Sequence, residues 1–158
     1  MPLKKDKAKP KEPAPNQAAG QESLLRQGIE ELGLRVEERS ASLLITYVSL
    51  LLQQNQTINL TAIIDPMEAV TKHLLDSLSI AQYIPDGRVV DVGSGGGCPG
   101  IPLAIIKPEN TFVLVEPKNK KAAFLKATTQ ALGLNNTKTI CERSESAKLE
   151  QKADAIVC

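Results

Sequence analysis

Hydrophobic residues recur at helical spacing in the first half of the chain. Between about residues 36 and 54, leucines and Tyr47 stand three or four positions apart, which predicts an amphipathic helix. A shorter helix is predicted over residues 21–34, with Gly33 at its end. Together with the helix described next, these segments predict a helical region over residues 21–85.

A third helix is predicted to begin at Pro66 and to end near Tyr83. Asp65 precedes it in the N-cap position, proline is favoured at the first helical position, and Glu68 completes a capping box. Its expected buried stripe is Met67, Val70, Leu74, Leu78 and Ala81.

From residue 86 onward, short runs of β-branched residues alternate with helical segments. The predicted strands begin at Val89 and cover Thr111–Val115, Thr137–Cys141 and Asp154–Cys158. This alternation is typical of an α/β domain with a mostly parallel, Rossmann-like sheet, whose ligands bind at the carboxyl ends of the strands. We expect such a domain over residues 86–158.

A glycine-rich turn follows the first of these strands. Its glycines allow a positive φ or a close approach to a ligand, and N–H groups at the start of the next helix attract acceptor-rich ligands. The pattern Asp91-x-Gly93-x-Gly95-x-Gly97 resembles the first motif of class I methyltransferases, which bind S-adenosylmethionine. A dinucleotide-binding G-x-G-x-x-G fails at Cys98 and fits only when counted from Gly95. A turn without a ligand is the third interpretation.

Polar residues also follow the next two strands. Glu116 ends the second strand, where an acid can accept ribose hydroxyls in nucleotide and S-adenosylmethionine sites alike. Arg143, Ser144 and Glu145 follow the third strand. Because carboxyl ends of parallel strands meet at one edge of a sheet, these positions predict a ligand site there.

Two other groups of polar residues have both a functional and a structural interpretation. Lys118, Lys120 and Lys121 stand in the predicted first turn of the helix after Glu116, where each opposes the helix dipole at a cost of ~0.3–1 kcal/mol. A bound anion such as RNA phosphate would compensate, and a solvated basic cluster is the alternative. His73, Asp76 and Ser77 are neighbours on the third helix, and a solvated helix face is the alternative there.

Composition and charge narrow the class of protein. Apolar residues make up 42% of the 158 residues, enough for a core, and the net charge of +1 does not by itself indicate a nucleic-acid binder. Residues 1–20 hold five lysines and almost no large apolar side chain, so we expect a disordered tail. Three cysteines without paired spacing indicate neither disulfides nor zinc. No apolar run reaches the length of a membrane span, which favours a cytoplasmic chain, and we expect a monomer.

Four stretches of the chain together resemble one known family: Asn59-Leu60-Thr61, His73-x-x-Asp76-Ser77, Asp91-Val92-Gly93-x-Gly95-x-Gly97-x-Pro99-Gly100-Ile101-Pro102-Leu103 and Glu142-Arg143-x-Glu145. They resemble the bacterial RsmG (GidB) methyltransferases, which methylate N7 of one guanine in 16S rRNA. The resemblance runs from about Gln21 to the end. It implies a class I S-adenosylmethionine-dependent methyltransferase fold preceded by a small helical region, with S-adenosylmethionine as cofactor and the 16S rRNA of the small ribosomal subunit as partner.

The resemblance also implies roles for individual residues. The methionine end of the cofactor would be held by Asp91, Gly93, Ser94, Gly95 and Gly97, the ribose by Glu116, and the adenine would be bordered by Ser144 and Glu145. The substrate side would be lined by Asn59, Thr61, His73, Asp76 and Ser77, and RNA would be contacted by Lys118, Lys120, Lys121 and Arg143. Guanine N7 carries a lone pair, so we expect direct methyl transfer without an obligatory catalytic base or a metal.

Two departures from the family pattern shape the expectation for this chain. Family members commonly carry Trp before the Asn of the first loop, where this chain has Gln54. The family also continues past the position of Cys158 with an arginine-containing segment and the last strands of its sheet, so we expect a fragment or a truncated gene product with an exposed sheet edge. The alternatives are an inactive RNA- or ribosome-binding remnant and, outside this family, a nicotinamide-dependent oxidoreductase.

Overall fold

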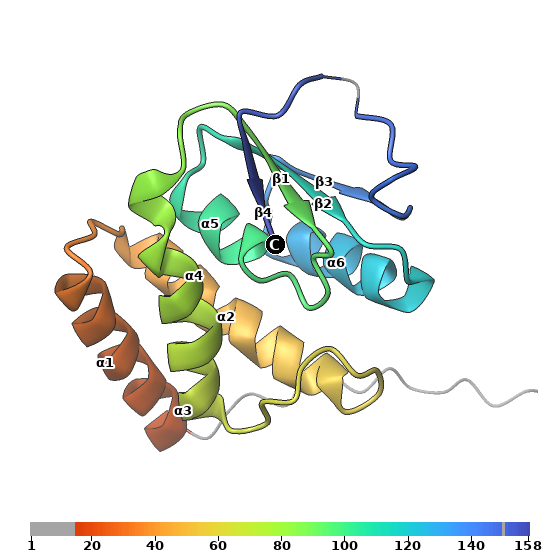
Figure 1. The fold of residues 1–158 in the computed structure, drawn as a ribbon. Coiled ribbons are helices and arrows are strands. Elements are labelled where there is room, and N and C mark those ends of the chain that lie inside the picture. Colours follow the sequence, from red (N-terminus) through yellow and green to blue (C-terminus); the bar gives the residue numbers. More distant parts are fainter. Residues whose placement is uncertain (1–14, 150) are drawn as a thin grey trace, which may run out of the picture.

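The computed structural model of the chain describes residues 15–149 and 151–158. The first half is helical and the second half holds a parallel sheet, as the hydrophobic pattern predicts (Figure 1). The tail predicted for residues 1–20 is too long, because residues 15–20 form the first turns of α1 (Pro15–Glu31). Directly after these turns, a hydrogen bond attaches α1 to Pro66: Gln21 Nε2 donates to the Pro66 carbonyl at 3.3 Å. The remainder of the predicted tail lies outside the described residues.

Two long helices and one broken helix form the helical region. After α1 come α2 (Glu38–Asn55) and a continuous segment made of α3 (Pro66–Ala69), η1 (Val70–Leu75) and α4 (Asp76–Ser79). The short turn η2 (Ala81–Tyr83) leads to the sheet. At Gly28, α1 lies so close to η1 that a Cβ would be 2.2 Å from Cδ1 of Leu75.

The third predicted helix differs from its expected form in two respects. It is π-helical over η1 and ends in the 3-10 turn η2, so it is not one regular helix. Asp65 caps it as predicted by accepting the N–H of Glu68 at 2.8 Å, but the Glu68 carboxylate pairs with Lys72 instead of completing the capping box. The predicted stripe is buried except at Met67, which is 37% exposed because Ala69 takes the buried position in this turn.

The sheet has four parallel strands in the order β3-β2-β1-β4. They are β1 (Arg88–Val92), β2 (Thr111–Val115), β3 (Thr137–Ile140) and β4 (Ala155–Val157). Helix α5 (Gly100–Ile106) follows β1 and α6 (Asn119–Ala131) follows β2. Gly133, with φ +67°, comes just after α6 as predicted. The predicted α/β class with a parallel sheet is therefore confirmed.

One hydrophobic core joins the helical region to the sheet. It includes Leu44 and Leu51 of α2 together with Ile101 of α5, Leu114 of β2 and Leu125 of α6. Figure 1 shows α5 and α6 on the side of the sheet that faces the helical region. As a result, α2 packs directly against the elements that follow β1 and β2.

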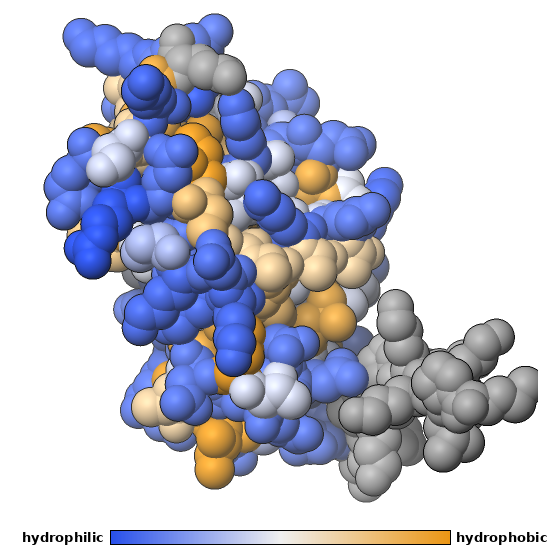
Figure 2. All heavy atoms as spheres, turned by 90° about the vertical axis from the view of Figure 1, so that its right-hand side faces the viewer, coloured by the Kyte–Doolittle hydropathy of each residue, from blue (hydrophilic) through white to orange (hydrophobic). Residues whose placement is uncertain are grey.

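The second face of the sheet carries a smaller apolar cluster. Val90, Val113 and Val115 are buried there, with Ala147 and Ala153 from the segment before β4 packed against them. Apolar side chains also reach the molecular surface, and Figure 2 shows them as a band between hydrophilic ones. In the described part of the chain, no helix is both long and apolar enough to cross a membrane.

Candidate functional site

The glycine-rich turn lies between the end of β1 and the start of α5. Gly93, Gly95 and Gly97 have φ values of +75°, +54° and +105°, which residues with a side chain adopt only with strain. A Cβ at Gly93 would meet no atom within 4 Å, whereas one at Gly97 would lie 2.6 Å from Cδ1 of Ile101. The turn is therefore open at its beginning and tightly packed at its end.

Strand β2 holds the first half of the turn. The N–H groups of Gly93 and Ser94 both donate to the carbonyl of Val115, at 2.8 and 3.1 Å. The Ser94 hydroxyl donates back to the carbonyl of Asp91 at 3.0 Å. These bonds fix the turn against the neighbouring strand at the carboxyl edge of the sheet.

Asp91 is a buried acid directly before the turn. It has no solvent exposure, and its Oδ2 accepts the N–H of Gly100 at 3.0 Å. Its Oδ1 has no hydrogen-bond partner among the described residues. Burial, opposed by the hydrogen bond from Gly100, raises the pKa of the Asp91 carboxyl to about 7. An unpaired buried acceptor of this kind is a place where a donor group of a ligand fits.

Glu116 joins the turn from the end of β2. Its side chain is buried, Oε2 accepts the N–H of Gly95 at 2.9 Å, and Oε1 accepts the N–H of Lys118 at 2.9 Å. Each carboxylate oxygen has a further lone pair, so Glu116 can hold the turn and accept a hydroxyl at the same time. The structure thus brings the two predicted acids to the same turn.

A cavity of about 220 Å³ lies beside the open end of the turn. It is lined by Val92, Gly93, Val115, Pro117, Arg143, Ser144 and Glu145. The pKa of the exposed Glu145 carboxylate is lowered by a backbone N–H and by the Ser144 hydroxyl, which donates to it at 3.2 Å. The residues predicted after the third strand therefore lie next to Gly93.

On the helical side, two of the predicted substrate-side residues contact each other. Thr61 Oγ1 lies 2.8 Å from Nε2 of His73. Burial lowers the pKa of His73, although Asp76 and Glu68 oppose this change, so the neutral imidazole is favoured near neutral pH. Asn59 is exposed on the same loop as Thr61.

The other two predicted residues of this helix, Asp76 and Ser77, differ in burial. Asp76 is exposed, whereas Ser77 is buried and its hydroxyl donates to the carbonyl of His73 at 2.5 Å. His73 and Ser77 are thus neighbours, as their spacing predicts, but Ser77 is buried and does not lie on the exposed surface.

Two functional candidates were absent from the sequence prediction. Asn55, which was not among the predicted site residues, holds the loop before Thr61: its Oδ1 accepts the N–H groups of Leu60 and Thr61, at 2.8 and 3.0 Å. Tyr47, considered only as a core residue, donates its hydroxyl to the carbonyl of Gly96 at 2.9 Å. The one sequence feature that pointed to Tyr47 is its hydroxyl in an apolar stripe, because a buried tyrosine hydroxyl requires a partner.

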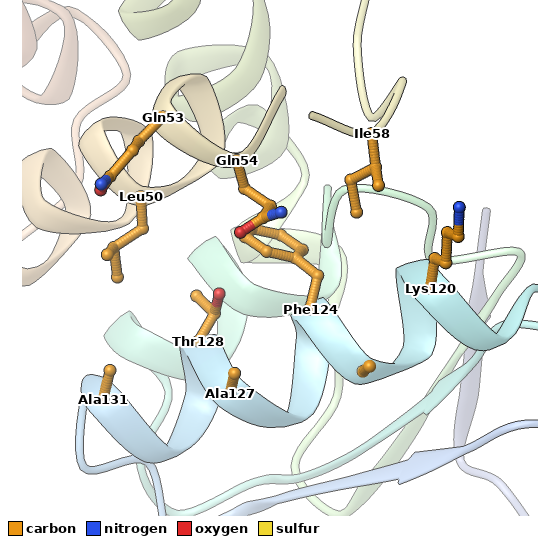
Figure 3. Close-up of a pocket in the computed structure, with 10 residues that line it drawn as sticks. Leu50, Gln53, Gln54, Ile58, Lys120, Phe124, Ala127, Thr128 and Ala131 are labelled. Carbon is orange, nitrogen blue, oxygen red and sulfur yellow. The ribbon is translucent and has the colours of Figure 1, made fainter. Parts of the chain in front are cut away.

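The predicted basic residues lie around the start of α6. This helix begins at Asn119, two residues after Pro117, so the predicted lysines occupy its N-cap and first turn. Between α2 and α6 runs a groove of about 540 Å³. Lys120 and Ile58 lie at one end of it and Ala131 at the other, with Gln53 and Gln54 along the α2 side (Figure 3). In the part of the chain that the structure describes, no group of three or more His, Cys, Asp or Glu side chains could hold a metal ion.

Comparison with known proteins identifies close relatives over most of this chain. Residues 40–158 match the family model GidB, described as rRNA small subunit methyltransferase G. Proteins named ribosomal RNA small subunit methyltransferase G from Vibrio campbellii and Azoarcus sp. are 41% and 45% identical over 139 and 134 residues, which cover 85% and 84% of this chain. The same segments cover 66% and 63% of those relatives, so the chain spans less than two thirds of their length.

A solved structure of coclaurine N-methyltransferase, bound to N-methylheliamine and SAH, is a more distant match. It is 14% identical with a TM-score of 0.48, and the match covers 93% of this chain and 45% of that one. A likeness at this level does not bear on function.

The raised pKa of Asp91 predicts a pH-dependent stability difference between the wild-type chain and Asp91→Asn. The pKa is about 7 in the folded chain against 3.8 as the ordinary value, so the unfolded chain releases this proton first as pH rises. The wild type therefore loses stability as pH rises from about 4 to about 7, and the full loss persists above pH 7, whereas Asn does not titrate. From pH 5 to pH 8, urea unfolding should therefore show the wild type losing roughly 1–4 kcal/mol relative to Asp91→Asn. An equal difference at both pH values would show that Asp91 titrates normally.

Proposed function

Because the chain belongs to the GidB family, rRNA small subunit methyltransferase G, we propose that it binds S-adenosylmethionine and transfers the methyl group to N7 of a guanine in 16S rRNA. This membership confirms the family predicted from the motifs of the sequence. The observation that carries this proposal is the open glycine turn between Asp91 and Glu116. The relatives' names supply the RNA substrate class, and the turn supplies a place for the cofactor.

The residues of the turn fit the cofactor group by group. Asp91 Oδ1, which has no partner in the described structure, would accept a donor from the amino-acid end of the cofactor. The free lone pairs of Glu116 would accept ribose hydroxyls. The cavity beside Gly93 would take the adenine between Val92, Pro117 and Ser144. The space beside Gly93 supports this arrangement, since a side chain there would occupy the open face of the turn.

The proposed reaction requires little acid–base chemistry from the protein. When bound, S-adenosylmethionine supplies a methyl group on a positively charged sulfur. The lone pair of guanine N7 would take up this methyl group, the sulfur would leave as a neutral thioether, and no proton would have to leave N7. The tasks of the chain are then to bind and align the two reactants. The Thr61–His73 pair, with its neutral imidazole, would position the base rather than accept a proton.

The RNA would approach from the side of α6 and the segment after β3. Lys118, Lys120 and Arg143 are exposed there, and exposed cations attract phosphates without reading sequence. A guanine that reacts at N7 beside a cofactor must be unstacked, which favours a loop of 16S rRNA in the small ribosomal subunit as the partner. A cytoplasmic location follows from that partner.

Of the alternative functions, the nicotinamide-dependent oxidoreductase loses its support, because the relatives at 41% and 45% identity are named rRNA methyltransferases. An RNA-binding remnant without cofactor binding remains the competing outcome of the experiments below.

Calorimetric titration with S-adenosylhomocysteine tests the cofactor site directly. We expect saturable binding by the wild-type chain and none by Gly95→Val, because Gly95 has φ +54° and donates to Glu116. Gly33→Val is the matched control: Gly33 has φ +67° and a Cβ there meets nothing within 4 Å, so it carries similar backbone strain away from the site. Equal losses in both variants would mean that strain, not the site, governs binding. A folded wild-type chain that does not bind would favour the remnant.

The RNA surface is tested by removing one charge at a time from α6. Lys120→Ala should weaken binding of a 16S rRNA fragment and reduce the salt dependence of the affinity by about 0.7–0.9 in the log–log slope. Lys126→Ala removes an exposed lysine of the same helix that does not line the groove, and should change neither quantity. If the two variants behave alike in filter binding across salt concentrations, the RNA does not contact the start of α6.

A further inference from the structure

The sequence of the glycine-rich turn does not by itself fix one backbone conformation. Residues 93–97 are four glycines and one serine, and glycine populates positive and negative φ about equally. Peptide planes between such residues rotate at little steric cost. A single conformation therefore requires hydrogen bonds that hold individual peptide groups from outside the turn.

Within the α/β domain, hydrogen bonds hold both ends of the turn: at its end, Gly97 donates its N–H to the carbonyl of Ser94 at 2.6 Å and accepts the N–H of Ile101 at 2.7 Å. Val115 and Glu116 hold the N–H groups of Gly93, Ser94 and Gly95. The carbonyl of Gly96 is held from the other side. It accepts the hydroxyl proton of Tyr47, which belongs to α2 in the helical region, at 2.9 Å.

Helix α2 also packs directly on this peptide. A Cβ at Gly96 would lie 2.9 Å from Cδ1 of Leu51 and 3.6 Å from the carbonyl of Leu60. The absence of a side chain at Gly96 thus lets α2 approach closely enough for the hydroxyl of Tyr47 to reach the backbone. Tyr47 itself has no solvent exposure, so water does not compete for that hydroxyl.

The environment of Tyr47 keeps its hydroxyl a donor. Burial raises the pKa of Tyr47 well above its usual value, with Cys98 and Asp91 adding to the rise, so the phenol stays protonated. Cys98 Sγ lies 3.0 Å from the same oxygen. Because the single phenol proton is directed to Gly96, the thiol is the donor in that second contact. The pKa of the Cys98 thiol is raised to about 11 by burial, so it too stays protonated.

We propose that Tyr47 is a positioning residue for the cofactor turn: its hydroxyl holds the Gly96 peptide so that the turn keeps the shape in which Gly93 is open and Gly95 lies against Glu116. The inference rests on the proposed function, since the turn is taken to bind S-adenosylmethionine. It assigns to the helical region a part in cofactor binding through α2. A residue that only filled the core would contribute to stability and leave ligand affinity unchanged.

The test compares ligand affinity with stability in two hydroxyl deletions. Tyr47→Phe keeps the buried ring and removes only the hydroxyl. Thr129→Val removes a buried hydroxyl of α6, which bonds the carbonyl of Leu125 at 3.0 Å within its own helix. Both variants should show a lower Tm. Calorimetry should show S-adenosylhomocysteine binding about five- to tenfold weaker for Tyr47→Phe and unchanged for Thr129→Val.

The outcomes are separable. Wild-type affinity in Tyr47→Phe, or an equal loss in Thr129→Val, would overturn the positioning role while leaving the cofactor site in place. Failure of the wild-type chain to bind would overturn the proposed function and this inference with it.

A second measurement needs no substitution and serves if Tyr47→Phe does not fold. The chain has two tyrosines, and Tyr83 is 75% exposed. With ring-labelled tyrosine, the NMR resonance of Tyr47 should shift when S-adenosylhomocysteine is added and that of Tyr83 should not. An unmoved Tyr47 resonance at saturating ligand would contradict the inference.

Discussion

The hydrogen bonds of the glycine turn connect the two halves of this molecule at the carboxyl edge of the sheet. A turn made of glycines has almost no side chains of its own to pack, and ordering each of its residues costs about 1–2 kcal/mol of conformational entropy. Here β2 provides acceptors for the first three N–H groups, and α2 provides a donor for the carbonyl that follows. The sheet and the helical region thus both order this turn by hydrogen bonds, and one hydrophobic core includes residues of both.

Two acids stand beside this turn in different protonation environments. Asp91 is fully buried with one unpaired oxygen, and its carboxyl titrates near neutral pH. Glu116 has backbone N–H donors on both oxygens. A positively charged ligand would favour ionised Asp91, because an opposite charge nearby lowers a carboxyl pKa. In the proposed function, a cation-bearing cofactor would therefore offset part of the electrostatic cost of ionising Asp91.

Local patterns made the sheet and the turn predictable from the sequence. The strand at residues 111–115, the position of Glu116 and the positive φ values of Gly93, Gly95 and Gly97 follow from β-branched runs and glycine spacing. The resemblance to a family also pointed correctly to membership, because its motifs are short and contiguous. What could not be predicted depends on contacts across the fold. The Tyr47–Gly96 bond joins residues 49 positions apart, and no periodicity encodes it. The π-helical form of η1, which packs against α1, likewise has no signal in the hydrophobic spacing.

The most direct test of a turn held ready for the cofactor is the amide NMR spectrum of the glycines before and after saturation with S-adenosylhomocysteine. Gly33 and Gly133 serve as internal references, since both have φ +67° and open surroundings away from the turn. We expect sharp amide resonances for Gly93, Gly95 and Gly97 in the free chain, which shift on binding while those of the two references stay in place. Turn resonances that are broadened by exchange without ligand, or that do not move at saturation, would contradict it.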